Sequence, residues 1–155
     1  AALVVIVIAI LPILTDRSTS VLAAQLTADH VKCFAVFRPR ETTGADPRAA
    51  ERQLASYGWR MHVPASSPDD GLRLLGVRRC LSAEGTLPHV MYEANGQPLS
   101  LFTLEGSRRP EATVSALGHQ CRIWKRDGRT FVLVGPRTPS PQLTRIAEYV
   151  EREAR

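Results

Sequence analysis

Two tight-turn dipeptides constrain the fold of this chain more than any other feature of its sequence. Asn95-Gly96 separates one pair of apolar runs, and Asp127-Gly128 separates a second pair. Asn-Gly and Asp-Gly suit the type I′ turn, which needs positive φ at both central residues and joins antiparallel strands. Two such hairpins in series predict an antiparallel sheet of four to five strands in meander order.

The expected strands flank these turns and are rich in β-branched, aromatic and leucine residues. They cover residues 72–81, 87–93, 99–104, 121–125 and 130–134. Because successive side chains of a strand point to opposite faces, His89 and Met91 are expected on one face and Val90 and Tyr92 on the other.

Two to three helices are expected around the sheet. Leu22, Leu26 and His30 recur every four residues, as on one face of a helix, and this helix should end near Pro39. Asp46 supplies an N-cap for a second, short helix, because it precedes a proline suited to the first turn.

The chain should end in a helix that covers the sheet. Ser140-Pro141 has the pattern of an N-cap followed by a first-turn proline. An apolar stripe follows, formed by Leu143, Ile146, Ala147 and Val150. Packing this stripe on one sheet face gives an α+β domain of two layers, a helical layer and an antiparallel sheet.

The first fourteen residues contain no charged or polar side chain. At ~1.5 Å per residue they span roughly 21 Å, less than the ~30 Å hydrocarbon core of a bilayer. Since the sequence begins inside this apolar run, we expect its true N-terminus to lie upstream. We interpret residues 1–20 as an incomplete transmembrane helix and residues 21–155 as an extracytoplasmic domain. A signal peptide and a buried helix are the alternatives.

The charge of the chain gives no nucleic-acid signature. Twenty Lys and Arg residues against fifteen Asp and Glu residues give a net charge of +5. The basic residues are scattered, and Arg78-Arg79 and Arg108-Arg109 are pairs rather than the longer runs of a nucleic-acid patch. The excess is consistent with an arginine-rich solvated surface, or with an acidic partner or anionic lipid headgroups.

His30, Cys33, Cys80 and His89 are the candidate metal ligands. His30 and Cys33 lie three positions apart on one face of the expected first helix. Cys80 and His89 lie on or between neighbouring strands. Copper or zinc accepts such ligands. The alternative is a Cys33–Cys80 disulfide, which would tie the first helix to the sheet and stabilise the fold by ~3–4 kcal/mol. With Cys121 the cysteine count is odd, and the sequence does not choose among the pairings.

No sequence motif predicts an enzyme. The chain has no G-x-S-x-G nucleophile elbow and no glycine-rich phosphate loop. It has neither the CxxC nor the HExxH pattern that would make a metal assignment specific. We therefore expect a non-catalytic domain without a cofactor.

Several blocks of the chain resemble a known class of bacterial regulator. They are LTADHVKCF (26–34), GWRMHVP (58–64), GLRLLGVRRCL (71–81) and HVMYEANGQPLSLF (89–102), with a closing helix. Their order and spacing are similar to the extracytoplasmic half of transmembrane anti-sigma factors. The resemblance implies a single-pass inner-membrane protein with its C-terminal domain in the periplasm. It also implies that the DHVKC block is a thiol or metal sensor.

Three functional hypotheses follow. The first is an accessory subunit that docks on a respiratory or photosynthetic membrane complex through its membrane segment and outer domain. The second is the sensory half of an anti-sigma-factor-like regulator. In that family a sigma factor is bound by an upstream cytoplasmic zinc domain with an HxxxCxxC core, which is not among these residues. The third is a metal or redox protein that uses the His, Cys and Met side chains. The expected partners are membrane subunits and the lipid bilayer.

Overall fold

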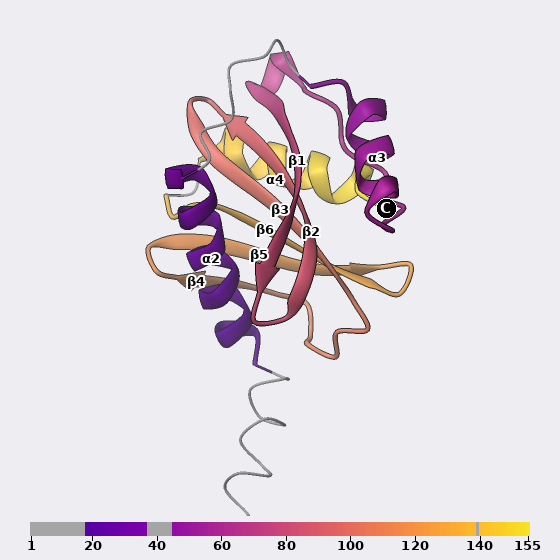
Figure 1. Cartoon of the computed structure of the whole chain (residues 1–155). Coiled ribbons are helices and arrows are strands. Elements are labelled where there is room, and N and C mark those ends of the chain that lie inside the picture. Colours follow the sequence, from indigo (N-terminus) through magenta and orange to yellow (C-terminus); the bar gives the residue numbers. More distant parts are fainter. Residues whose placement is uncertain (1–17, 37–44, 139) are drawn as a thin grey trace, which may run out of the picture.

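The computed structural model describes residues 18–36, 45–138 and 140–155. Within these ranges the chain forms an α+β domain with three α-helices, one 3-10 turn and six strands (Figure 1). The helices are α2 (Thr19–Val36), α3 (Pro47–Ser56) and α4 (Pro141–Glu153), and the 3-10 turn is η1 (Pro68–Asp70). The strands are β1 (Leu72–Ser82), β2 (Gly85–Ala94), β3 (Gln97–Glu105), β4 (Ala112–Ala116), β5 (His119–Arg126) and β6 (Arg129–Pro136).

The six strands form one antiparallel sheet in the order β1-β2-β3-β6-β5-β4. The predicted hairpins are confirmed, because Asn95-Gly96 joins β2 to β3 and Asp127-Gly128 joins β5 to β6 with positive φ at all four residues. The expected single meander is wrong. The chain crosses from β3 to the far edge strand β4, and β6 then returns to pair with β3. The strand β4 was not predicted: its five residues alternate in burial, but they are few and mostly small, which gives a weak strand signal.

The prediction of two layers is also wrong, because helices cover both faces of the sheet (Figure 1). On one face, α3 and α4 contribute Leu54, Ile146 and Val150 to a core with Tyr92 and Phe131. On the other face, α2 packs against a second set of buried side chains. These are Cys80, Leu87, Met91, Phe102, Cys121, Ile123, Val132 and Val134. The central strands β3 and β6 are therefore buried on both faces along most of their length.

A β-bulge in β1 decides which of its side chains face α2. The pairing with β2 shifts between Leu74 and Gly76, so that one extra residue enters β1. Before the bulge, Leu74 lies opposite Tyr92 on the α3/α4 face; after it, Cys80 lies opposite Leu87 on the α2 face. Without the extra residue, Cys80 would share the face of Leu74. The bulge therefore brings Cys80 to α2.

The helix predictions are confirmed within the described residues. Asp46 and Ser140 cap α3 and α4 through their side chains, and both helices begin with proline. The proposed transmembrane segment falls mainly on residues 1–17, outside those that the structure describes. Thr19 and Ser20 belong to α2. Among the helices of the described ranges, none is long and apolar enough to cross a bilayer.

We predict that α2 is stabilised by one face only. Leu26 is fully buried under the sheet, so Leu26→Ala should lower the free energy of unfolding by about 2–5 kcal/mol. Val31 is 47% exposed on the same helix, and Val31→Ala should change it by at most about 0.5 kcal/mol. Denaturant unfolding of both variants measures the difference. Equal effects would contradict the docking of α2 described here.

A buried Cys–Cys–His centre between α2 and the sheet

Three of the predicted metal ligands meet between α2 and the sheet. Cys33 Sγ of α2 lies 3.8 Å from Cys80 Sγ of β1. One ligand atom each from Cys33, Cys80 and His89 lies within 4.8 Å of the other two. Cys33 is 1% exposed, Cys80 is 3% exposed and His89 is fully buried. These three residues form what we call the Cys–Cys–His centre.

The fourth predicted residue, His30, lies two hydrogen bonds away from the centre, with Ser100 between it and His89. Ser100 Oγ on β3 is 2.8 Å from His89 Nε2 and 2.7 Å from His30 Nδ1. The ring of His30 also packs edge-on against His119, with ring centroids 5.0 Å apart. His30 therefore belongs to the surroundings of the centre, and Ser100 links it to His89.

Local backbone geometry explains how the centre assembles. His30 and Cys33 are three residues apart on α2 and so share one face. On β2, His89 alternates with the α3/α4-facing Val90 and therefore points to α2. Ser100 lies opposite Met91 on the same sheet face. The bulge in β1 brings Cys80 to this face as well.

The two thiols of the centre have very different affinities for a proton. A hydrogen bond from Cys80 is the main cause that lowers the pKa of Cys33, burial opposes it, and the nearby His89 ring lowers it further. The pKa of Cys80 is raised by its hydrogen bond to Cys33 and by burial. The hydrogen bond between the two sulfurs therefore favours loss of the first proton of the pair, with Cys33 the more acidic of the two thiols. A thiolate is the reactive and metal-binding form of cysteine.

Both histidines are neutral at ordinary pH. Burial, followed by the charges of His119 and His89, lowers the pKa of His30 to about 3. Burial also lowers the pKa of His89, although the Cys33 thiolate opposes this shift. The Nδ1 atom of His89 is buried and makes no hydrogen bond of acceptable geometry to a described residue. The Cys33 sulfur nevertheless lies close enough to the ring to interact with it by hydrogen bonding and by charge, which lowers the pKa of Cys33.

Cys121 lies apart from the centre. Its sulfur is 3.3 Å from Thr27 Oγ1 and contacts the carbonyl oxygen of Ala23, both on α2. Burial raises the pKa of its thiol. Cys121 is therefore a protonated packing residue under α2, and it provides a matched control for the other two cysteines.

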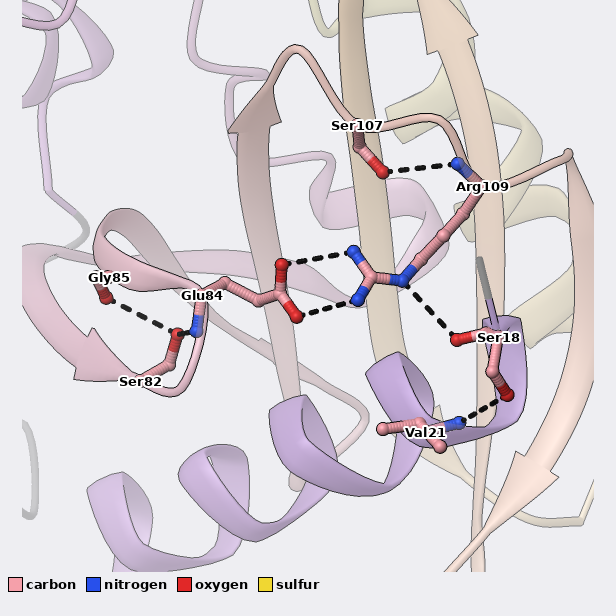
Figure 2. A network of polar contacts seen from close by, with 7 residues as sticks. All are labelled: Ser18, Val21, Ser82, Glu84, Gly85, Ser107 and Arg109. Atoms are coloured by element: carbon pink, nitrogen blue, oxygen red, sulfur yellow. Dashed lines mark hydrogen bonds and ion pairs between the residues drawn. The ribbon is translucent and has the colours of Figure 1, made fainter. Parts of the chain in front are cut away.

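The N-terminal end of α2 is held by a separate ion pair. Arg109, which is 3% exposed, donates two hydrogen bonds to the carboxylate of Glu84 at 2.7 and 3.0 Å. Its Nε donates to the carbonyl oxygen of Ser18 at 3.3 Å, and the Ser18 hydroxyl accepts from Val21 N (Figure 2). Arg109 thus joins the β1–β2 turn to the first turn of α2. It also lines a cavity of about 570 Å³ with Arg60, Arg108 and Arg129.

Sequence reasoning missed two parts of this arrangement. Ser100 could not be recognised from the sequence, because a single serine in an apolar strand forms no motif. Only the sheet register, which puts it on the same face as His89, reveals its role. Arg108-Arg109 was expected to be scattered surface charge, but Arg109 is buried against Glu84. A bulge cannot be read from the β1 sequence beyond the presence of Gly76.

The low pKa of His30 predicts a pH-dependent stability. An unfolded histidine titrates near pH ~6.5, so below this pH the unfolded chain binds a proton that the folded chain refuses. The free energy of unfolding should therefore fall with falling pH, by up to about 1.4 kcal/mol per unit for this residue. In metal-free protein, His30→Gln should flatten the dependence between about pH 6 and 4. His62→Gln on the opposite side should leave it steep, and an unchanged slope in His30→Gln would contradict the assignment.

The Glu84–Arg109 pair should contribute strongly because its cation is buried. Glu84→Gln should lower the free energy of unfolding by about 3 kcal/mol, since it removes the charge facing Arg109. Glu105→Gln is the matched control, because Glu105 is 73% exposed and lies 3.9 Å from Arg129. Glu105→Gln should lower the free energy of unfolding by less than about 1 kcal/mol. Thermal unfolding of both variants tests the difference, and similar losses would refute it.

Comparison with known proteins assigns no family to this arrangement. No protein-family model matches the chain, and no curated protein matches it. The function is therefore argued from the centre itself and from its position between α2 and the sheet.

Proposed function

We propose that the chain is the sensory domain of a membrane-anchored, anti-sigma-factor-like regulator, and that the Cys–Cys–His centre is its thiol switch. One observation carries the proposal: the sulfurs of Cys33 and Cys80 lie 3.8 Å apart and come from α2 and from the sheet. A disulfide between them would tie the end of the helix covalently to the sheet, whereas in the reduced state that end is held by packing and hydrogen bonds alone. The signal is the redox state of this pair.

The switch is an exchange between thiols and a disulfide. The Cys33 thiolate attacks a small or protein disulfide, which forms a mixed disulfide and releases one thiolate. Cys80 then loses its proton and attacks the Cys33 sulfur, which releases the second thiolate and leaves a Cys33–Cys80 disulfide. Two cysteine thiols are oxidised and one external disulfide is reduced to two thiols. The unequal proton affinities of the pair suit Cys33 for the first attack.

Burial of the pair makes access the controlling step. Both sulfurs are shielded, so the oxidant reaches them only when the end of α2 opens. Cys33 lies one turn before the last residue of this helix, Val36, which is 66% exposed. Local opening of a terminal turn requires much less free energy than global unfolding. We therefore expect oxidation to depend on the mobility of this end of α2.

The position of α2 gives the switch a route to the membrane side. This helix begins at Thr19, and four residues separate it from the apolar run 1–14 that makes up most of the proposed membrane segment 1–20. Arg109 holds its first turn and the Cys–Cys–His centre holds its last turns. A change at the centre alters how α2 is docked on the sheet, and α2 is continuous with the chain that leads to the membrane.

A second candidate is the accessory subunit of a membrane complex. Leu81 on the edge strand β1 is 74% exposed, and the described strands leave the outer side of β1 without a partner. Ser67 and Ala45 hydrogen-bond this edge at Leu72 and Leu74, so the end of β1 that carries Leu81 is the exposed part. An exposed edge carrying a large apolar side chain favours association with another subunit. Purification from detergent-solubilised membranes separates the two roles. A stoichiometric complex that is lost in Leu81→Glu and contains no sigma factor would favour the subunit and refute the sensor.

The thiol switch predicts one specific disulfide. Oxidised glutathione should convert the reduced chain to a form with a single free thiol, on Cys121. The disulfide should stabilise the fold by about 3–4 kcal/mol, because it closes a long loop. It should also slow hydrogen exchange at the end of α2. Thiol counting under denaturing conditions, peptide mapping and exchange mass spectrometry measure these effects.

Cys121→Ser is the control for this experiment, since it removes a thiol of equal burial outside the centre. It should leave the oxidation of the other two cysteines unchanged, whereas Cys33→Ser and Cys80→Ser should each abolish it. Three free thiols after prolonged oxidation of the wild-type chain would rule out the switch. A disulfide that includes Cys121 would rule it out as well.

A further inference from the structure

We propose that the Cys–Cys–His centre binds one soft metal ion, cuprous copper, through the sulfurs of Cys33 and Cys80 and Nδ1 of His89. This inference rests on the proposed sensory role and names the effector that competes with oxidation for the two thiols.

The spacing of the sulfurs fits a shared metal ion. Two sulfurs about 2.3 Å from one ion lie about 3.8–4.0 Å apart at bond angles between tetrahedral and trigonal. Cys33 Sγ and Cys80 Sγ are 3.8 Å apart. The same separation permits an S–H···S hydrogen bond in the metal-free protein, so the ion can enter without a rearrangement of either backbone.

The histidine supplies an independent observation. His89 is fully buried, and its Nδ1 makes no well-aligned hydrogen bond to a described residue, although the ring interacts with the nearby Cys33 sulfur. Buried polar atoms without a well-aligned partner are rare unless they serve a function. Nε2 of the same ring is held by Ser100. Nδ1 is therefore the nitrogen available to a ligand that also contacts the two sulfurs.

The donor set selects the type of ion. Thiolate ligands favour cuprous copper and zinc over harder ions such as magnesium, calcium and manganese. A structural zinc site takes four protein ligands. Within the described ranges, the group of His, Cys, Asp and Glu ligand atoms has only three members. Cuprous copper is satisfied by three soft donors in a dry site, and all three residues are buried.

The hydrogen bonds around His89 can adapt to the ion. Metal binding at Nδ1 requires the neutral ring to carry its proton on Nε2, which then donates to Ser100 Oγ. The Ser100 hydroxyl in turn donates to His30 Nδ1. In the metal-free state the hydrogen bonds can run the other way: His30 donates to Ser100, and Ser100 donates to Nε2 of His89. The proton of His89 is then on Nδ1, which faces the Cys33 sulfur. Binding of the ion therefore fixes one direction of this hydrogen-bonded chain.

Nearby charges act on the centre in both directions. Arg78 lowers the pKa of Cys33 electrostatically and so favours its thiolate. At Cys80, the charge of the buried Asp29 raises the pKa, and the smaller effect of Lys32, its ion-pair partner on the same helix, lowers it. Two thiolates with one monovalent ion leave a single negative charge, which Arg78 balances in part.

The test uses the full chain in detergent micelles, reduced and without oxygen. Cuprous ion is titrated against a colorimetric cuprous chelator. We expect one equivalent to bind, with the ultraviolet charge-transfer absorption of a copper–thiolate bond. Cys33→Ser and Cys80→Ser should abolish this absorption, and Cys121→Ser should keep it. Ser100→Ala should weaken binding by about 10–100-fold, because Ser100 positions the His89 ring.

A readout on the wild-type chain avoids any dependence on how the variants fold. The ¹⁵N resonance of His89 Nδ1 should shift when cuprous ion is added, and that of His62 should not. A bound ion should also block formation of the Cys33–Cys80 disulfide by oxidised glutathione. Absence of binding, or equal binding by Cys33→Ser, Cys80→Ser and Cys121→Ser, would overturn the proposal. Tight four-coordinate binding of zinc with no uptake of cuprous ion would overturn it too.

The metal site and the thiol switch fail in different ways. If oxidised glutathione forms the Cys33–Cys80 disulfide but cuprous ion does not bind, the metal inference is wrong and the switch stands. If cuprous ion binds at the centre but oxidation never joins the two cysteines, the site exists and the thiol switch is wrong.

Discussion

The docking of α2 on the sheet depends on a polar centre in an apolar interface. Leu22 and Leu26 supply the hydrophobic contact of this helix, but its last turns end on Cys33 and the neighbouring His30. A buried cysteine can serve as a small apolar residue, whereas a thiolate and two neutral histidines must be satisfied by one another. The centre therefore determines the position of the last turns of α2 on the sheet and the stability of their contact with it.

Two devices hold α2, and they respond to different conditions. The buried Arg109–Glu84 pair acts at the first turn and needs only that both groups stay charged. The Cys–Cys–His centre acts at the last turns, and the proposed thiol switch and metal site would make it respond to oxidation or to a soft metal ion. The contact at the first turn is thus permanent, whereas the contact at the last turns would respond to chemistry. The end of α2 near Val36 is therefore the part that a signal would loosen or fix.

Much of the fold could be predicted from the sequence, because local chemistry fixes it. Asn95-Gly96 and Asp127-Gly128 define their hairpins, and Asp46 and Ser140 define two helix starts. The strand order and the third layer could not be predicted. They depend on which face each apolar run buries, and long apolar runs such as β6 look alike whether one or both faces are covered.

The same limit applies to the centre. The sequence identified Cys33, Cys80 and His89 by residue type, but their meeting depends on one inserted residue near Gly76. A strand has a period of two, so a single bulge moves Cys80 from the α3/α4 face to the α2 face without any change of composition. The glycine, with its φ of +147°, adopts a backbone conformation that other residues rarely reach. The chemistry proposed for the two thiols thus depends on a backbone irregularity four residues, or roughly 13 Å, along the strand from Cys80. This is why residue types alone could not place the two thiols together.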